Sequence, residues 1–183
     1  MKRLIPLIAL LLVAVAGLAR AEWRAGAGTA FLIDDEDTLF GLLVEGGGYY
    51  PTGTIDSFFG AQLLLSGNDE ETSNTTTEAD YLALMALYRG YFPLGSSGMF
   101  RIYGEGGLGL GRSAVEYSTR RGNIDSDEVG LALQLGFGVE VGLGDRFALR
   151  GGYDVVGLPE NSGDFGDIGG FFSSFSLGFV FRF

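Results

Sequence analysis

The chemistry open to this chain is limited first by the residue types that it lacks. Its 183 residues include no histidine and no cysteine, with 23 Asp and Glu against 12 Lys and Arg. A serine nucleophile usually needs a histidine base, and Ser173, Ser174 and Ser176 have no suitable base beside them in the sequence. We therefore expect neither enzymatic activity nor a cofactor. The lack of cysteine excludes disulfides and thiolate metal sites.

Short acidic runs offer a different chemistry, because hard divalent cations prefer carboxylate oxygens as ligands. The runs are Asp34, Asp35, Glu36 and Asp37, then residues 69–71, then residues 125–128. The spacing of Asn123, Asp125 and Asp127 lacks the glycine and the distal glutamate of an EF-hand loop. The alternative interpretation is a solvated, mutually repulsive surface. We favour this alternative and keep only the first run as a weak candidate metal site.

Arginines and glutamates within strand-like segments are the third candidate, and hydrophobic alternation defines those segments. Side chains of a strand point alternately to opposite faces. At the C-terminus, one face is Phe175, Leu177, Phe179, Phe181 and Phe183, and the other is Ser176, Gly178, Val180 and Arg182. A soluble protein would bury the apolar face in its core, whereas a membrane barrel would expose it to lipid. The preceding segments decide between these two structures.

Eight strand-like segments follow one another along the chain. Their approximate bounds are residues 22–33, 38–50, 55–66, 78–92, 99–112, 129–141, 146–156 and 171–183. Most exceed the roughly 9–11 residues that a tilted strand needs to cross a bilayer. The connections at residues 51–54, 93–98 and 142–145 are short, whereas those at 67–77, 113–128 and 157–170 are longer and polar. Short turns at one end and long loops at the other are typical of a transmembrane barrel, although the loop at 34–37 is short.

Charged residues share a strand face with glycine and alanine. In the sixth segment, one face is Val129, Leu131, Leu133, Leu135, Phe137, Val139 and Val141, and the other is Gly130, Ala132, Gln134, Gly136, Gly138 and Glu140. A soluble barrel such as a lipocalin would instead place large apolar residues inside and a solvated polar face outside. We therefore predict an all-β, eight-stranded antiparallel up-and-down transmembrane barrel. Alternation is weak at residues 63–65, and the register of the fourth segment depends mainly on Arg89 pointing inward.

The predicted interior brings arginines together with carboxylates and amides. The inward residues are Arg24, Glu45, Gln62, Arg89, Arg101, Glu105, Gln134, Glu140, Arg150, Asp154 and Arg182, with a charge network centred on Glu45, Arg89, Arg101, Glu105, Glu140 and Arg150. Buried charges need partners, and the planar guanidinium pairs bidentately with carboxylates. Eight strands enclose a lumen that side chains just fill, so we predict a plug; the alternative is a gate in a small pore. Replacing Arg101 with Ala is expected to destabilise the barrel by leaving a carboxylate unpaired.

Aromatic residues gather near both ends of the predicted strands, as expected at the two membrane interfaces. Those near the turns are Trp23, Tyr49, Tyr50, Tyr91, Phe92, Phe100, Phe147 and Phe183, and those near the loops are Phe31, Phe40, Tyr81, Tyr153, Phe171 and Phe172. A ligand cage is the alternative. The glycines at 26 and 28 and in the 104–111 run are reminiscent of phosphate-binding loops. They lie within strand patterns with no helix after them, so we reject that interpretation.

The N-terminus has the pattern of a secretory signal, and the remainder has the length of one domain. Lys2 and Arg3 supply positive charge, residues 4–18 form the apolar run, and residues 19–21 form an A-x-A cleavage site. A membrane anchor is the alternative, but the run is short for a transmembrane helix. We expect a signal peptide at 1–21 and a barrel at 22–183. The net charge of −11, without a basic stripe, argues against nucleic-acid binding.

The last strand-like segment carries a resemblance to a known family. Ser176, Gly178, Phe181 and Phe183 match the signal that the barrel-assembly machinery reads: a polar residue, a glycine, a hydrophobic residue and a terminal aromatic. Together with the eight segments, they make the chain similar to the small outer-membrane β-barrel proteins, of the outer-membrane protein A transmembrane-domain and outer-membrane protein X types. The resemblance implies the bacterial outer membrane, contact with its lipid and lipopolysaccharide, and assembly by that machinery.

The loops of that family diverge widely, so the resemblance implies no binding specificity and leaves any extracellular ligand unidentified. We expect a structural or surface-interaction role, adhesin-like, in a barrel plugged by its Arg/Glu network. A periplasmic anchoring role is not implied, because no peptidoglycan-binding segment follows the last strand of the sequence. The alternative function is a small pore for ions or small solutes.

Overall fold

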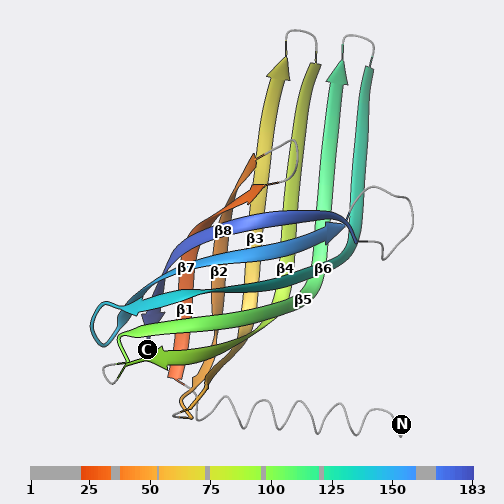
Figure 1. Ribbon diagram of the computed structural model, residues 1–183. Coiled ribbons are helices and arrows are strands. Elements are labelled where there is room, and N and C mark those ends of the chain that lie inside the picture. Colours follow the sequence, from red (N-terminus) through yellow and green to blue (C-terminus); the bar gives the residue numbers. More distant parts are fainter. Residues whose placement is uncertain are drawn as a thin grey trace, which may run out of the picture.

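The fold was analysed in a computed structural model that describes residues 22–33, 38–52, 54–72, 75–95, 98–119, 122–159 and 168–183. The strands are β1 (Glu22–Ile33), β2 (Thr38–Tyr50), β3 (Asp56–Thr72), β4 (Thr75–Leu94), β5 (Phe100–Thr119), β6 (Gly122–Gly142), β7 (Phe147–Pro159) and β8 (Ile168–Arg182). Each strand pairs antiparallel with its neighbours in sequence, and β8 closes the barrel by pairing with β1 (Figure 1). The predicted eight-stranded up-and-down barrel is confirmed.

The two ends of the barrel differ in how the strands are joined. We name the end that holds the short connections β2–β3, β4–β5 and β6–β7, together with the C-terminal Phe183, the turn end. Gly95, Gly98 and Gly144 lie in these connections with positive φ angles, a conformation that residues with a Cβ rarely adopt. We name the opposite end the hairpin end.

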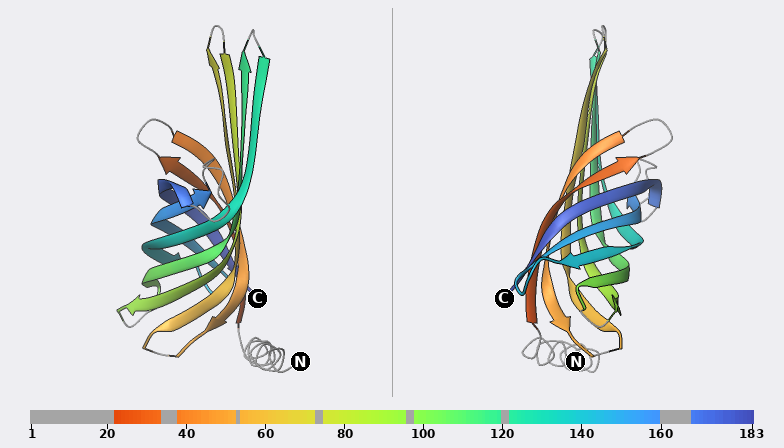
Figure 2. Two further views of the ribbon diagram at one scale, coloured as in Figure 1. Left: turned by 90° about the vertical axis from the view of Figure 1, so that its right-hand side faces the viewer. Right: turned by 60° about the vertical axis from the view of Figure 1, so that its left-hand side comes forward.

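Two long hairpins rise from the hairpin end, where the sequence predicted loops. The β3–β4 ladder continues to Thr72↔Thr75, and the β5–β6 ladder continues to Thr119↔Gly122. Because β4 also pairs with β5 along this whole length, the four strands form one sheet that stands above the barrel (Figures 1 and 2). The prediction of loops at residues 67–77 and 113–128 was therefore wrong. Backbone pairing continues from ladders already in register and does not require an apolar face.

The outer surface of the barrel is apolar, as the alternation predicted. Large hydrophobic residues of every strand are exposed on it, among them Leu84, Leu108, Leu135, Phe137 and Phe179. The weak alternation in β3 is settled by pairing, since Leu64 points inward and Leu65 outward. A barrel wall of this kind suits acyl chains rather than water. Among the described residues, no helix reaches the length and apolarity needed to cross a bilayer.

The interior is layered, and its apolar part was not predicted. Toward the hairpin end, ten buried residues form a hydrophobic cluster, each at most 5% exposed: Ala30, Leu32, Leu39, Leu64, Ala83, Met85, Ala132, Val156, Leu158 and Phe172. Toward the turn end, a second cluster holds Tyr49, Phe58, Leu87, Tyr91 and Tyr103. Tyr49, Tyr91 and Phe172 were expected in the interfacial belts and instead face inward. They alternate with outward neighbours, so position along a strand does not determine face.

Candidate functional site

Two charge clusters occupy the lumen, and the first lies at its centre. We call Glu45 of β2, Arg89 of β4, Glu105 of β5 and Arg150 of β7 the central cluster. Arg89 donates through Nε to Glu105 Oε2 at 2.5 Å, and through Nη1 and Nη2 to the two oxygens of Glu45 at 3.3 and 3.1 Å. Arg150 Nη1 donates to Glu45 Oε1. Two arginines and two carboxylates therefore pair at this level, and the buried Asp154 of β7 lies beside Glu105 as a third carboxyl group.

Strand pairing explains only part of the central cluster. Arg89 and Glu105 are direct cross-strand partners between β4 and β5. Glu45 lies on β2 and reaches Arg89 and Arg150 across the lumen. The cluster is continued by Gln134, which donates to Glu105 Oε1 at 3.0 Å and accepts a hydrogen bond from Gln62 at 2.7 Å. Amide and guanidinium donors thus satisfy the buried carboxylates.

The second cluster lies at the turn end and has a different composition. We call Arg24 of β1, Arg101 of β5, Glu140 of β6 and Arg182 of β8 the turn-end cluster. All three guanidinium groups approach one atom, Glu140 Oε1, with nitrogens at 3.4 Å for Arg24, 3.7 Å for Arg101 and 3.2 Å for Arg182. Arg101 is the cross-strand partner of Glu140, and Arg24 is the partner of Arg182. Three cations therefore share one carboxylate.

An aromatic ring supports the arginines of the turn-end cluster. The Arg24 guanidinium lies over the Tyr49 ring, 3.2 Å from its centroid, and the Arg101 guanidinium lies 5.4 Å from the same centroid. Both distances are within the range of cation–π attraction. Tyr49 donates its hydroxyl hydrogen to Asp56, which also accepts from the Thr52 N–H at 3.0 Å. The ring is thereby fixed beneath the two cations.

A polar cavity of about 720 Å³ opens at the turn end below this cluster. Arg24, Arg101 and Arg182 are among the residues that line it. Several buried polar atoms of the cluster have no hydrogen-bond partner among the described residues, namely Nε of Arg24, Arg101 and Arg182, Nη1 of Arg101 and Oε2 of Glu140. The cluster therefore has free donor capacity beside an open cavity.

All six residues predicted as the centre of the lumen network face inward, but they do not form one network. Glu45, Arg89, Glu105 and Arg150 lie in the central cluster, whereas Arg101 and Glu140 lie in the turn-end cluster. Sequence alternation identified the inward face of each strand. It could not show that Arg24 and Arg182 come together on Glu140, because closure of β8 on β1 creates that contact.

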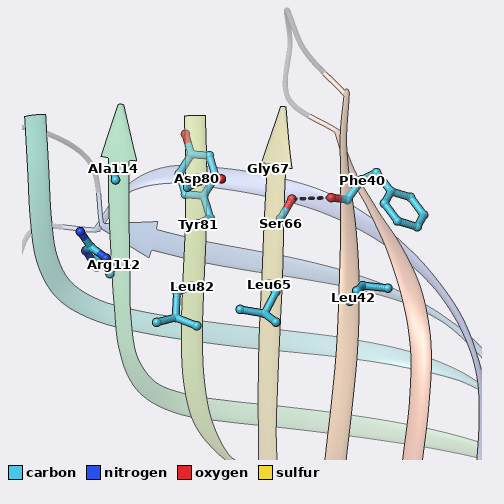
Figure 3. Close-up of a pocket in the computed structure, with 10 residues that line it drawn as sticks. All are labelled: Phe40, Leu42, Leu65, Ser66, Gly67, Asp80, Tyr81, Leu82, Arg112 and Ala114. Carbon is cyan, nitrogen blue, oxygen red and sulfur yellow. Dashed lines mark hydrogen bonds between the residues drawn. The ribbon is translucent and has the colours of Figure 1, made fainter. Parts of the chain in front are cut away.

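A groove of about 500 Å³ marks the outer surface where the barrel meets the protruding sheet. In Figure 3, Leu42, Leu65 and Leu82 lie in a row on neighbouring strands, with Arg112 and Asp80 nearer the hairpins. Arg112 pairs bidentately with Asp127 at 2.8 and 2.7 Å, and both side chains are more than half exposed. Hydrogen bonds from Arg112 lower the pKa of the Asp127 carboxyl group.

The remaining predicted sites are placed only in part. Ser176, Gly178, Phe181 and Phe183 lie at the end of β8, where the Phe181 ring packs against Phe147 at 5.0 Å and Phe183 at 4.7 Å. The weak metal candidates Asp34, Asp35, Glu36 and Asp37 lie outside the described residues. Within the described part of the chain, no group of three or more acidic residues is arranged to hold a metal ion.

Comparison with known proteins places this geometry in context. Among solved structures, Ail of Yersinia pestis matches with 14% identity and a TM-score of 0.58, covering 89% of this chain and 97% of Ail. Neisserial surface protein A matches with 18% identity and a TM-score of 0.55, covering 88% and 96%. At such identities the likeness concerns the fold alone. No curated protein sequence matches this chain.

The family model described as "Outer membrane protein beta-barrel domain" matches residues 5–183, nearly the whole chain. This match agrees with the closed eight-stranded barrel and with its apolar outer wall. It confirms the resemblance to the small outer-membrane barrels and the bacterial outer membrane as location. In barrels of this family the short turns face the periplasm and the longer connections face outward. The chain therefore belongs to the outer membrane protein beta-barrel domain family.

Proposed function

We propose that this protein is a closed, non-enzymatic outer-membrane barrel that holds the protruding sheet as a binding surface for an extracellular partner. The observation that carries this proposal is the free edge of that sheet. The β6–β7 ladder begins only at Leu133↔Gly157, so residues 122–132 of β6 pair with β5 on one side and with no strand of the described residues on the other. Residues 68–72 of β3 likewise extend beyond the last pair with β2, Phe40↔Gly67.

An unpaired strand edge presents N–H and C=O groups that a further strand can bind. The β6 edge is long, and the sheet behind it is held by two complete ladders, β3–β4 and β4–β5. A rigid sheet loses little conformational entropy when a strand adds to it. We infer that an extended segment of the partner pairs with residues 122–132.

The charge of the sheet supports a basic partner. In the sequence, the β3–β4 hairpin carries Asp69, Glu70, Glu71, Glu78 and Asp80, and the β5–β6 hairpin carries Glu116, Asp125, Asp127 and Glu128 against Arg112, Arg120 and Arg121, so the two hairpins together are acidic. Repeated negative charge keeps the sheet edges of two copies of this chain from pairing with each other, and it attracts positively charged segments of other proteins. Ail has been described in complex with the heparin analogue sucrose octasulfate. A sulfated ligand would be repelled by the acidic sheet of this chain.

The interior supports a barrel that does not conduct. The ten-residue apolar cluster fills the lumen toward the hairpin end, and the central cluster lies next to it. An ion would have to displace packed apolar side chains to cross such a layer. In planar bilayers, we expect no steady unitary currents from the purified barrel. Steady unitary currents would instead support the small-pore function.

The binding proposal is tested with synthetic strand peptides. A peptide of about six residues with alternating lysine and valine is titrated calorimetrically into the purified barrel in neutral detergent. We expect saturable binding that weakens as salt is raised, because charge attraction contributes. A matched peptide with glutamate in place of lysine should not bind. A lysine–valine peptide with a central proline should bind far more weakly, because proline cannot donate to the ladder.

A shortened barrel provides the matched control protein. Residues 68–79 and 115–126 are each replaced by an Asn-Gly turn, which joins Gly67 to Asp80 and Ala114 to Asp127, two cross-strand pairs of the native structure. This barrel should fold and bind the peptide far more weakly, because it keeps only residues 127–132 of the β6 edge and loses most of the hairpin carboxylates. Equal binding by the native and shortened barrels would refute the proposal, as would equal binding of the proline peptide.

Three further features of this function remain proposals. Residues 1–21, which lie outside the described part, would be the signal peptide removed before the barrel at 22–183. Ser176, Gly178, Phe181 and Phe183 would be the signal for the barrel-assembly machinery. Outer-membrane lipid and lipopolysaccharide would contact the apolar wall, with acyl chains entering the groove of Figure 3. Replacing Phe183 with Ser should reduce the amount of barrel inserted in the outer membrane, as measured by heat-modifiable migration in gels.

A further inference from the structure

We propose that the turn-end cluster is a binding site for a compact, polyvalent oxyanion of the phosphate class that enters from the periplasm. This inference does not depend on the protruding sheet or its partner. It begins from the stoichiometry of the cluster, in which Arg24, Arg101 and Arg182 all approach a single oxygen of Glu140. One carboxylate cannot neutralise three guanidinium groups, so positive charge is left over.

The burial of the cluster makes the excess charge significant. The Arg24 side chain is 2% exposed, that of Glu140 is fully buried, and those of Arg101 and Arg182 are 16% exposed. Little solvent is available to screen charges at such positions. A buried cation without a full complement of partners is unfavourable unless an anion supplies them.

The unsatisfied donors indicate where the anion would lie. Nε of Arg24, Arg101 and Arg182 and Nη1 of Arg101 are buried and have no hydrogen-bond partner among the described residues. All three arginines, which come from β1, β5 and β8, also line the 720 Å³ cavity at the turn end.

The other charged residues that line the cavity are of both signs, and one of them, Asp56, is itself buried. Asp56 accepts hydrogen bonds from Tyr49 and Thr52. Glu22 is more than half exposed and lies 3.9 Å from Arg24, while Asp145 and Arg146 are exposed. Exposed rim charges are screened by salt, so the inner arginines dominate the field that a bound anion experiences. The rim carboxylates limit the affinity and favour a small anion over a large acidic one.

The donor set selects the chemistry of the ligand. Guanidinium groups bind phosphate through paired N–H donors, and three such groups around one space match the several oxygens of a phosphate. The volume of the cavity is within the range of small-molecule sites. Chloride offers a single charge and no directional oxygens, so we expect phosphate to bind more tightly than chloride.

The first experiment titrates inorganic phosphate into the intact barrel in neutral detergent, with chloride at matched ionic strength as the control. We expect saturable heat with one site per barrel, and an unfolding temperature that rises with phosphate but not with chloride. No saturable heat, or equal stabilisation by chloride, would overturn the proposal. Dioctanoyl phosphatidic acid tests the alternative source of the phosphate group. Binding of this lipid without binding of phosphate would overturn the assignment to a free anion.

Matched variants locate the site. Arg101→Gln and Arg182→Gln keep donor groups and remove charge from the two less buried arginines, and each should weaken phosphate binding about tenfold. Arg112→Gln makes the same chemical change on the outer surface and should leave binding unchanged. Heat-modifiable migration in gels confirms that each variant is folded. Unchanged affinity in both lumen variants, or equal loss in Arg112→Gln, would overturn the proposal.

Glu140→Gln separates binding from structural support. Removing the carboxylate leaves three cations without a native counterion, so the barrel without phosphate should become less stable. Phosphate affinity should rise, because the competing negative charge is gone. A merely structural cluster would lose stability with no gain in affinity. Lower phosphate affinity in folded Glu140→Gln would overturn the proposal.

Discussion

The central cluster and the turn-end cluster use the same residue types, and they differ in how the charges balance. At the centre, Arg89 pairs with Glu45 and Glu105, Arg150 pairs with Glu45, and the carboxyl group of Asp154 lies beside Glu105. At the turn end, three arginines share Glu140. The central cluster lies between packed layers, whereas the turn-end cluster borders an open cavity. Burial therefore requires each arginine of the packed centre to meet a carboxylate, whereas the unmatched charge at the turn end lies beside a cavity that can admit an anion.

The largest expected effect comes from breaking the balanced cluster. Arg89→Met should destabilise the barrel by about 3–5 kcal/mol, because it leaves Glu45 and Glu105 short of a buried partner. Denaturant unfolding of the barrel in lipid vesicles measures this change. Arg112→Met, in which an exposed arginine is lost, is the control and should change stability far less. Similar stability of the two variants would show that the central cluster is not a structural unit.

The next effect concerns the single anion of the turn-end cluster. Glu140→Gln should lower stability by about 1.5–3 kcal/mol, because each guanidinium loses a charge-assisted hydrogen bond or ion pair. Added phosphate should restore part of the loss. The control variant Glu45→Gln should also be less stable than the native barrel, but added phosphate should not restore its stability. Denaturant unfolding with and without phosphate measures both effects. If phosphate restored the stability of both variants, the two clusters would not differ in anion binding.

A smaller effect is expected for Arg101, which the sequence alone placed among the critical residues. Arg24 and Arg182 still donate to Glu140 when Arg101 is replaced, so no carboxylate is left unpaired. Arg101→Ala should therefore lower stability much less than Arg89→Met in thermal or denaturant unfolding. A loss as large as that of Arg89→Met would restore the original hypothesis of one continuous network.

The smallest effect is expected outside the lumen, at the exposed pair of Arg112 and Asp127. Because Arg112 lowers the pKa of Asp127, the pair favours the folded state only above the unfolded-state pKa of Asp127. That contribution disappears as pH falls through the lowered folded-state pKa. NMR titration of the Asp127 carboxyl carbon should show a pKa below the ordinary aspartate value, and Arg112→Gln should raise it. An unshifted pKa in the native barrel would contradict the pairing.

Much of the barrel can be predicted from the sequence, because the side chains of a membrane-spanning strand alternate between the lipid and the lumen. The bounds of β1 and β2 match the predicted 22–33 and 38–50, and Arg89 faces inward as predicted. The protruding sheet did not follow, since its polar residues carry no alternation and resemble a loop. The inward positions of Tyr49 and Phe172 were not predicted either, because aromatic residues near strand ends occur both in the lumen and at the membrane interface.

By itself, the sequence determined that apolar and polar side chains alternate along the strands, and hence that the chain forms an outer-membrane barrel with charged residues inside. Only the tertiary structure decided which charges meet. Closure of β8 on β1 brings Arg182 beside Arg24, and the width of the lumen lets Glu45 reach Arg89 and Arg150 from another strand. The physical reason is distance: alternation is a property of neighbouring residues, whereas neutralisation depends on atoms that meet across a closed ring of strands.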